Sequence, residues 1–115
     1  MRIPASLLLV LAVLSSACKP SGDANPVELG KRAWVANCIA CHNMDPAKEG
    51  TLGPAVAGSS LALVDARVMR AEYPPGYTPK RASALMPAQP FLKNDVPALA
   101  AYLESLAPTA APTPQ

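Results

Sequence analysis

Residues 38–42 of the chain read Cys-Ile-Ala-Cys-His, two cysteines three positions apart with a histidine directly after the second. This spacing is the signature of covalent c-type haem attachment. On a helix, residues i and i+3 share a face, so Cys38 and Cys41 can form thioethers with the two vinyl groups of one porphyrin. His42 then lies beneath the iron as an axial ligand. The motif predicts a domain built around one haem.

Two other uses of Cys38 and Cys41 compete with this interpretation. A redox-active dithiol of the thioredoxin kind lies near a βαβ pattern, which the sequence lacks. A structural zinc site needs a second pair of Cys or His ligands, whereas His42 is the only histidine of the chain. Haem attachment therefore fits the sequence better than either alternative.

The amino terminus has the layout of an export signal over residues 1–17. Arg2 supplies the positive charge, and residues 5–14 form an apolar stretch too short to span a bilayer comfortably. The run that ends at Cys18, Leu-Ser-Ser-Ala-Cys, resembles a bacterial lipoprotein signal, in which the cysteine is acylated and becomes the first residue of the mature chain. Because Ser15 stands where a bulky aliphatic residue is usual, ordinary cleavage after Ala17 is the alternative.

Cysteine usage favours the lipoprotein. Once Cys38 and Cys41 are bound to haem, Cys18 has no partner, and a free thiol in an oxidising compartment needs an explanation. Acylation of Cys18 provides one, and its acyl chains would hold the domain at a membrane surface. We therefore expect an exported protein, on the periplasmic side, anchored to a membrane through Cys18.

The length of the chain allows one small domain. Removal of residues 1–17 from the 115-residue chain leaves 98 residues. Residues 18–25 are expected to be a tether, 26–107 the folded domain and 108–115 a disordered proline-rich tail. The ten basic residues, which include Arg2 of the signal, nearly balance the eight acidic ones and form no stripe, so nucleic-acid binding is not supported.

Helix signals are clear at both ends of the domain. The run Asn-Pro-Val-Glu at 25–28 provides an N-cap, a proline at the first helical position and a glutamate able to complete a capping box, and it starts a helix that ends near Ile39. A second helix is expected over 95–106, capped by Asn94 and carrying an apolar stripe. A short helix over 61–72 is expected between them.

The spacing of residues in the two end helices resembles that of the class I c-type cytochromes, and the resemblance covers nearly the whole mature domain. Gly30 and Trp34 stand eight and four residues before Cys38, where the family has a glycine and an aromatic residue that pack across the carboxy-terminal helix. Leu99 and Tyr102 match the family partners of this pair. The resemblance implies an all-α cytochrome c fold, in which the N- and C-terminal helices pack across each other around one covalently bound haem c.

A further match follows the histidine. Gly53-Pro54 stands where the family has a Gly-Pro, with Pro54 twelve residues after His42. The resemblance implies that the carbonyl of Pro54 accepts the Nδ1–H of His42, which would fix the orientation of the ring and strengthen it as a ligand.

The second axial ligand decides the chemistry, and cytochromes c pair histidine with methionine. Met44 is too close to His42 in the chain to reach the opposite face of the porphyrin easily. Met69 lies in the expected short helix, where methionine is more often core filler. Met86 lies in a proline-rich irregular stretch before the last helix, which is the setting of the family's methionine ligand. We therefore predict that His42 and Met86 are the two iron ligands.

The remaining site residues are predicted from the family's general layout. The family covers the lower edge of the haem with donors to the propionates, and in the loop 72–81 Tyr77 and Arg81 are the candidates. A solvated loop is the alternative. The apolar candidates for the haem pocket, each equally compatible with ordinary core, are Val56, Leu63, Val68, Leu85 and Phe91.

A haem with both axial positions filled has no place for a small-molecule substrate. The resemblance therefore implies a one-electron carrier, not an enzyme, that shuttles electrons between periplasmic or membrane-bound redox proteins. The nearest alternative is a dedicated haem subunit of a periplasmic dehydrogenase. Alternatives of other classes are a gas-binding haem sensor or minor peroxidase with an open iron site, and a haem-free structural lipoprotein.

Overall fold

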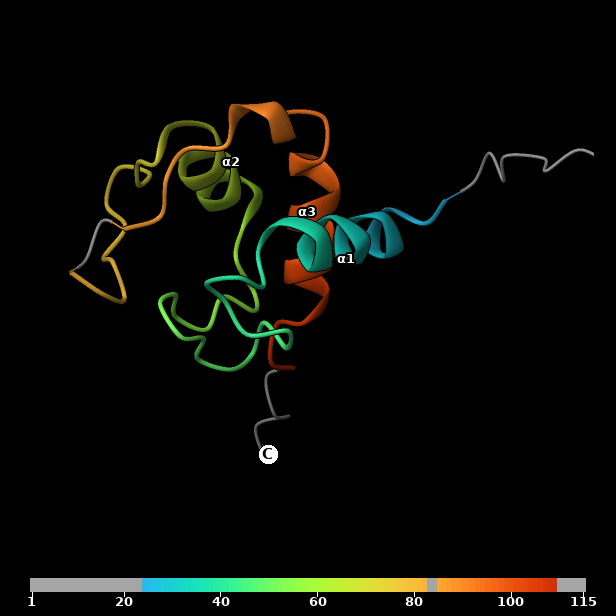
Figure 1. The fold of residues 1–115 in the computed structure, drawn as a ribbon, viewed down its shortest axis with the longest axis horizontal. Coiled ribbons are helices and arrows are strands. Elements are labelled where there is room, and N and C mark those ends of the chain that lie inside the picture. Colours follow the sequence, from blue (N-terminus) through green and yellow to red (C-terminus); the bar gives the residue numbers. More distant parts are fainter. Residues whose placement is uncertain (1–23, 83–84, 110–115) are drawn as a thin grey trace, which may run out of the picture.

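The computed structural model describes residues 24–82 and 85–109. The expected export signal, Cys18 and most of the proline-rich tail lie outside the described residues. The helical elements of the described part are α1 (Pro26–Asn37), α2 (Leu61–Arg70), the 3-10 turn η2 (Pro90–Leu92) and α3 (Val96–Ser105), as Figure 1 shows. The predicted all-α class is confirmed. Within these residues no helix combines the length and apolar character that a bilayer crossing requires.

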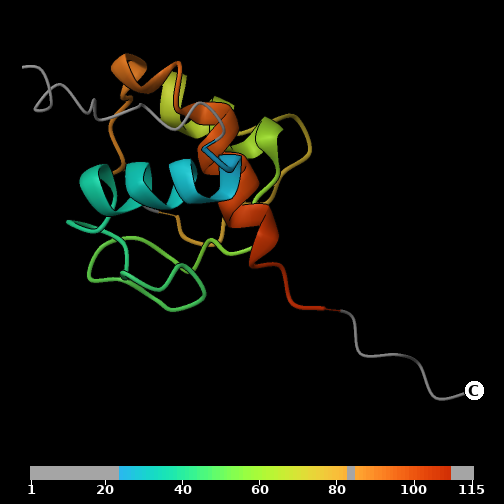
Figure 2. The ribbon, with the colours of Figure 1, turned by 90° about the vertical axis from the view of Figure 1, so that its right-hand side faces the viewer.

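Helices α1 and α3 cross in direct contact (Figures 1 and 2). The contact is closest at Gly30, where an added Cβ would lie 1.9 Å from the carbonyl oxygen of Ala98 and 2.7 Å from the Cβ of Tyr102. Only a residue without a side chain allows the two backbones to approach this closely. The predicted crossing of the N- and C-terminal helices is therefore confirmed, with Gly30 at the contact.

The hydrophobic core lies where α2 and η2 join this helix pair. Leu99, 2% exposed, is its most buried large side chain. Ser60 caps α2 by accepting a hydrogen bond from the amide of Leu63 at 3.3 Å, and Ala71 ends the helix in a left-handed conformation, earlier than predicted. The buried residues of the core are Trp34, Val64, Val68, Leu92, Val96, Leu99, Ala100, Tyr102 and Leu103.

The cysteine motif lies after α1 and not within it, because the helix ends at Asn37 and Cys38 is its C-cap. The amides of Cys41 and His42 both donate to the carbonyl of Cys38, at 3.2 and 3.0 Å. This hydrogen-bonded turn takes the place of the predicted last helical turn.

The predicted cap of the last helix is wrong. Asp95, not Asn94, is the N-cap residue of α3, and its side chain makes no capping hydrogen bond. The chain enters α3 directly from η2, with the amide of Asp95 donating to the carbonyl of Leu92 at 2.8 Å. Because η2 already provides the turn, α3 starts without a side-chain cap.

Candidate functional site

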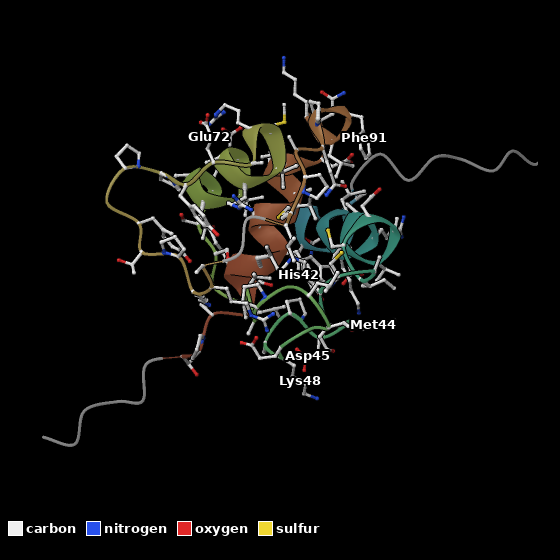
Figure 3. The ribbon with its side chains drawn as sticks, turned by 60° about the vertical axis from the view of Figure 1, so that its left-hand side comes forward. His42, Met44, Asp45, Lys48, Glu72 and Phe91 are labelled. Atoms are coloured by element: carbon white, nitrogen blue, oxygen red, sulfur yellow. The ribbon has the colours of Figure 1, made fainter. Side chains whose placement is uncertain are left out.

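A cavity of about 310 Å³ lies between α1, α2, α3 and the chain that precedes η2. Cys38, Cys41 and His42 line one part of it, and Met86 also lines it. Apolar residues of α2 and α3 form much of the remaining wall. Figure 3 shows His42 in the middle of the molecule, between the helices and the long loop that follows the motif. The structure thus brings the predicted attachment and ligand residues to one cavity.

The ring of His42 is held at its Nδ1 atom. This nitrogen lies 3.1 Å from the carbonyl oxygen of Pro54. Because a carbonyl can only accept, Nδ1 carries the proton and Nε2 keeps its lone pair for a metal. The predicted His42–Pro54 hydrogen bond is confirmed.

Gly53 explains how the loop comes so close to this ring. It is buried, and a Cβ there would lie 2.4 Å from Cε1 of His42. Burial lowers the pKa of His42, so its imidazole is neutral at neutral pH. The neutral ring is the form that binds iron.

The two cysteines differ in their surroundings. Cys38 is half-buried, and burial raises the pKa of its thiol to about 11, whereas Cys41 is exposed. Both thiols are free. A redox-active dithiol needs a thiol with a lowered pKa, so the environment of Cys38 argues against that alternative.

The three methionines of the described residues occupy different places. Met86 is half-buried and lines the cavity. Met69 is half-buried against the core, and Met44 is 60% exposed; neither lines the cavity. Figure 3 shows Met44 at the periphery of the molecule. Met86 is therefore the methionine that shares the cavity with His42.

Trp34 connects the helix crossing to the cysteine motif. Trp34 is 3% exposed and lines the cavity, and its ring lies 5.4 Å from the ring of His42, centroid to centroid. Its indole Nε1 donates to the carbonyl of Met44 at 3.2 Å, which holds the chain just after the motif. Trp34 thus fixes the position of His42 from the side of α1.

Four of the five predicted apolar pocket residues line the cavity, namely Val56, Leu63, Val68 and Leu85. Leu85 is 68% exposed, so it lies at the mouth of the cavity. The prediction for Phe91 is wrong: it is 72% exposed and projects from η2 at the edge of the molecule (Figure 3). Since the short turn buries Leu92 in the core, its neighbour Phe91 points outward.

Tyr77 and Arg81, predicted near the propionates, both line the cavity. Nη1 of Arg81 donates to the carbonyl of Leu52 at 2.8 Å, and Nη2 forms an ion pair with Glu49. This pairing lowers the pKa of the Glu49 carboxyl. Their role toward the propionates stays a prediction.

Sequence reasoning missed Arg67, which lines the cavity from α2. Its guanidinium lies 4.3 Å from the centroid of the Tyr73 ring, and Nη1 donates to the carbonyl of Ala71 at 2.6 Å. Tyr73 in turn stacks on Tyr77, with centroids 5.4 Å apart and planes 7° from parallel. A signal existed, because Arg67 follows Leu63 by one helical turn and so shares its face.

This set of residues fits a covalently attached haem. Two thiols, an imidazole with Nε2 available and a methionine thioether line one largely apolar cavity, and Gly53 packs closely against the His42 ring. The wall of the cavity also carries hydroxyl and guanidinium groups, in Tyr77, Arg67 and Arg81. The chemistry of the donors is that of an iron porphyrin site.

Comparison with known proteins matches the chain to a protein family. The family model described as "Cytochrome c" matches residues 27–107. No curated protein and no solved structure matches the chain significantly.

Proposed function

Since the chain belongs to the cytochrome c family and so carries a covalent c-type haem for electron transfer, we propose that it is a one-electron carrier in which His42 and Met86 would hold the haem iron. The observation that carries this proposal is the lining of the cavity, which includes His42 and, among the described methionines, Met86. The haem supplies the one-electron redox chemistry when bound.

The chain's own residues would set how readily that electron is accepted. The thioether of Met86 favours ferrous iron and raises the reduction potential. The carbonyl of Pro54, 3.1 Å from Nδ1 of His42, increases the basicity of the ring and acts in the opposite direction. Tyr77, Arg67 and Arg81 line the cavity and provide the donors that we assign to the propionates.

We further propose that the protein is exported and held at a membrane surface through an acylated Cys18. The support comes from residues 1–18 of the sequence, which combine a short apolar stretch with a lipoprotein-like end. The mature domain would then work on the periplasmic side.

Its partners are redox proteins, and the mouth of the cavity is where we expect them to dock. Leu52, 50% exposed, and Leu85, 68% exposed, both line the cavity and stand at its rim. A free shuttle uses a small and weak contact of this kind, whereas a dedicated dehydrogenase subunit would bury a larger area and copurify with its enzyme. Copurification from native membranes separates the two.

Replacement of Met86 by alanine tests the proposed ligation. We expect the ferrous wild-type protein not to bind carbon monoxide readily at neutral pH, because His42 and Met86 would both hold the iron. The Met86→Ala variant should bind it. Met44→Ala is the matched control and should behave like the wild type, since Met44 is exposed and outside the cavity. Carbon monoxide binding is read from the absorption spectrum of the reduced protein.

Ready binding by the wild type would show an open iron site and favour the gas-binding alternative. Binding by Met44→Ala but not by Met86→Ala would show that the wrong methionine had been assigned.

Mass spectrometry of the intact mature protein tests the anchor. We expect a mass that includes one haem and the acyl groups, and a Cys18→Ser variant that keeps the haem but lacks the acyl groups. A mature wild-type chain that begins at Cys18 with an unmodified thiol contradicts the anchor and leaves the electron-carrier function untouched.

A further inference from the structure

The loop 49–55 packs directly against the haem-binding motif. The amides of Leu52 and Gly53 donate to the carbonyl of Cys41 at 3.0 and 2.9 Å. The next residue, Pro54, presents its carbonyl to Nδ1 of His42. Any movement of this loop therefore changes the hydrogen bond that orients the proposed iron ligand.

Two cations from a distant part of the chain donate hydrogen bonds to backbone carbonyls of the same loop. Arg81 donates through Nη1 to the carbonyl of Leu52 at 2.8 Å, and Lys80 donates through Nζ to the carbonyl of Ala55 at 2.7 Å. These two carbonyls lie on either side of Gly53-Pro54. The two cations thus bond the chain on both sides of Gly53-Pro54, which contacts the His42 ring.

Glu49 completes the arrangement from within the loop. One carboxylate oxygen accepts from the amide of Ala55 at 3.3 Å, and the other is paired with Nη2 of Arg81. A guanidinium that bonds a carboxylate and a carbonyl together fixes direction as well as distance, which a simple pair of charges does not.

We propose that the Arg81–Glu49 pair is a latch that positions the Pro54 carbonyl against His42 and thereby sets the strength of His42 as an iron ligand. Arg81 and Glu49 are positioning residues that act through the loop 49–55. The inference rests on the ligation proposed above for His42.

An exposed ion pair taken alone contributes little to stability, so the test must separate the latch from the charges themselves. The double variant Glu49→Gln/Arg81→Gln does this, because it removes the pair and leaves the net charge unchanged. The matched control is Asp65→Asn/Arg70→Gln, which removes another exposed Arg–carboxylate pair, 2.9 Å apart on α2, with the same balance of charge.

The first readout is hydrogen exchange in the reduced holoprotein, followed by NMR. The reporters are the amides of Leu52 and Gly53 and the Nδ1–H of His42. We expect exchange about threefold to tenfold faster in Glu49→Gln and in Arg81→Gln, with no further increase in the double variant, because either substitution opens the same contact. Arg81→Lys should lie between these variants and the wild type, since one ammonium cannot reproduce the two-pronged contact.

The second readout is the reduction potential. If only charge mattered, Glu49→Gln would raise the potential and Arg81→Gln would lower it. The double variant would then lie at or below the wild type, because Arg81 lines the cavity and Glu49 does not. A latch adds an upward shift of the reduction potential to all three variants, because a less firmly bonded His42 stabilises ferric iron less. We therefore expect the double variant to have a higher potential than the wild type. At a fixed ambient potential we expect about a twofold to tenfold higher ratio of reduced to oxidised protein, where tenfold corresponds to 59 mV for one electron.

Unchanged exchange at all three reporters, with a potential in the double variant no higher than that of the wild type, overturns the proposal. An equal effect in the α2 control pair overturns it as well. Should Arg81→Gln fail to mature with haem, Glu49→Gln and Arg81→Lys still provide the exchange comparison. Failure of the electron-carrier proposal would appear separately, as ready carbon monoxide binding by the wild type.

Discussion

We expect Gly30→Ala to destabilise the protein, although the same change would stabilise an exposed helix. In an isolated helix this change stabilises by about 1 kcal/mol, because alanine has the higher helix propensity. Here the new Cβ would lie 1.9 Å from the carbonyl oxygen of Ala98, well inside the 3.4–4 Å of ordinary contact. The obstacle is backbone, so no rotamer change relieves it, and α1 must move away from α3.

The cost of that movement exceeds the gain in propensity. Overpacking of a well-packed contact costs about 1–3 kcal/mol or more, and separation of the helices also loosens Trp34 and Leu99. We expect a net loss of about 2 kcal/mol. For a domain of this size such a loss lowers the midpoint of thermal unfolding by about 8–16 °C.

Thermal unfolding of the haem-loaded protein, followed by far-ultraviolet circular dichroism, measures this loss. Arg32→Ala, at an exposed position of the same helix, is the control and should change stability by no more than about 0.5 kcal/mol. A Gly30→Ala variant as stable as the wild type, or more stable, would refute the close backbone contact between α1 and α3.

Three further predictions concern the core, the pH dependence and the potential. Leu99→Ala should cost about 2–5 kcal/mol in denaturant unfolding, against a small loss for Leu61→Ala, because Leu99 is 2% exposed and Leu61 49%. Pairing with Arg81 lowers the pKa of Glu49 below its ordinary 4.5. The stability lost in Glu49→Gln should therefore be constant above that pH and should vanish as the pH falls through the lowered pKa. Acid titrations of both proteins measure this difference, and a difference that grows in acid contradicts the pairing. Arg67→Gln should lower the reduction potential in a spectroelectrochemical titration, because loss of a cation on the cavity wall stabilises ferric iron. An unchanged potential would show that Arg67 does not lie close to the haem.

The parts of the fold that follow from local chemistry could be predicted from the sequence. Asn25 accepts a hydrogen bond from the amide of Val27 at 2.9 Å, and α1 begins at Pro26, as the capping pattern indicated. The bond from His42 to the carbonyl of Pro54 also follows from a fixed offset along the chain. Such features need only a few neighbouring residues or a family spacing to be recognised.

Helix ends and side-chain directions in irregular segments were predicted less well. Asn94 is a good cap residue by type, but the hydrogen bond from Asp95 to Leu92 already forms the turn. Phe91 is apolar and near the site in sequence, yet the direction of a side chain in a 3-10 turn depends on tertiary packing. Here Leu92 is buried in the core and Phe91 points outward.

The contacts around the loop 49–55 could not be found from sequence, because they join residues far apart in the chain. Arg81 and Glu49 are 32 residues apart, and neither lies in a helix whose periodicity would place it. Both read as solvated charges until the fold brings them together. The same holds for Lys80 and the carbonyl of Ala55, 25 residues apart.

The cavity and the hydrophobic core are not separate parts of this molecule. Trp34, Val64, Val68, Leu99 and Leu103 are buried members of the core, and each of them also lines the cavity. A porphyrin held there by Cys38 and Cys41 would complete the packing of these side chains. Substitutions in this shared wall must change stability and haem environment together. Glu49 and Arg81 lie outside the hydrophobic core, so we expect their substitution to change the haem environment with only a small loss of stability.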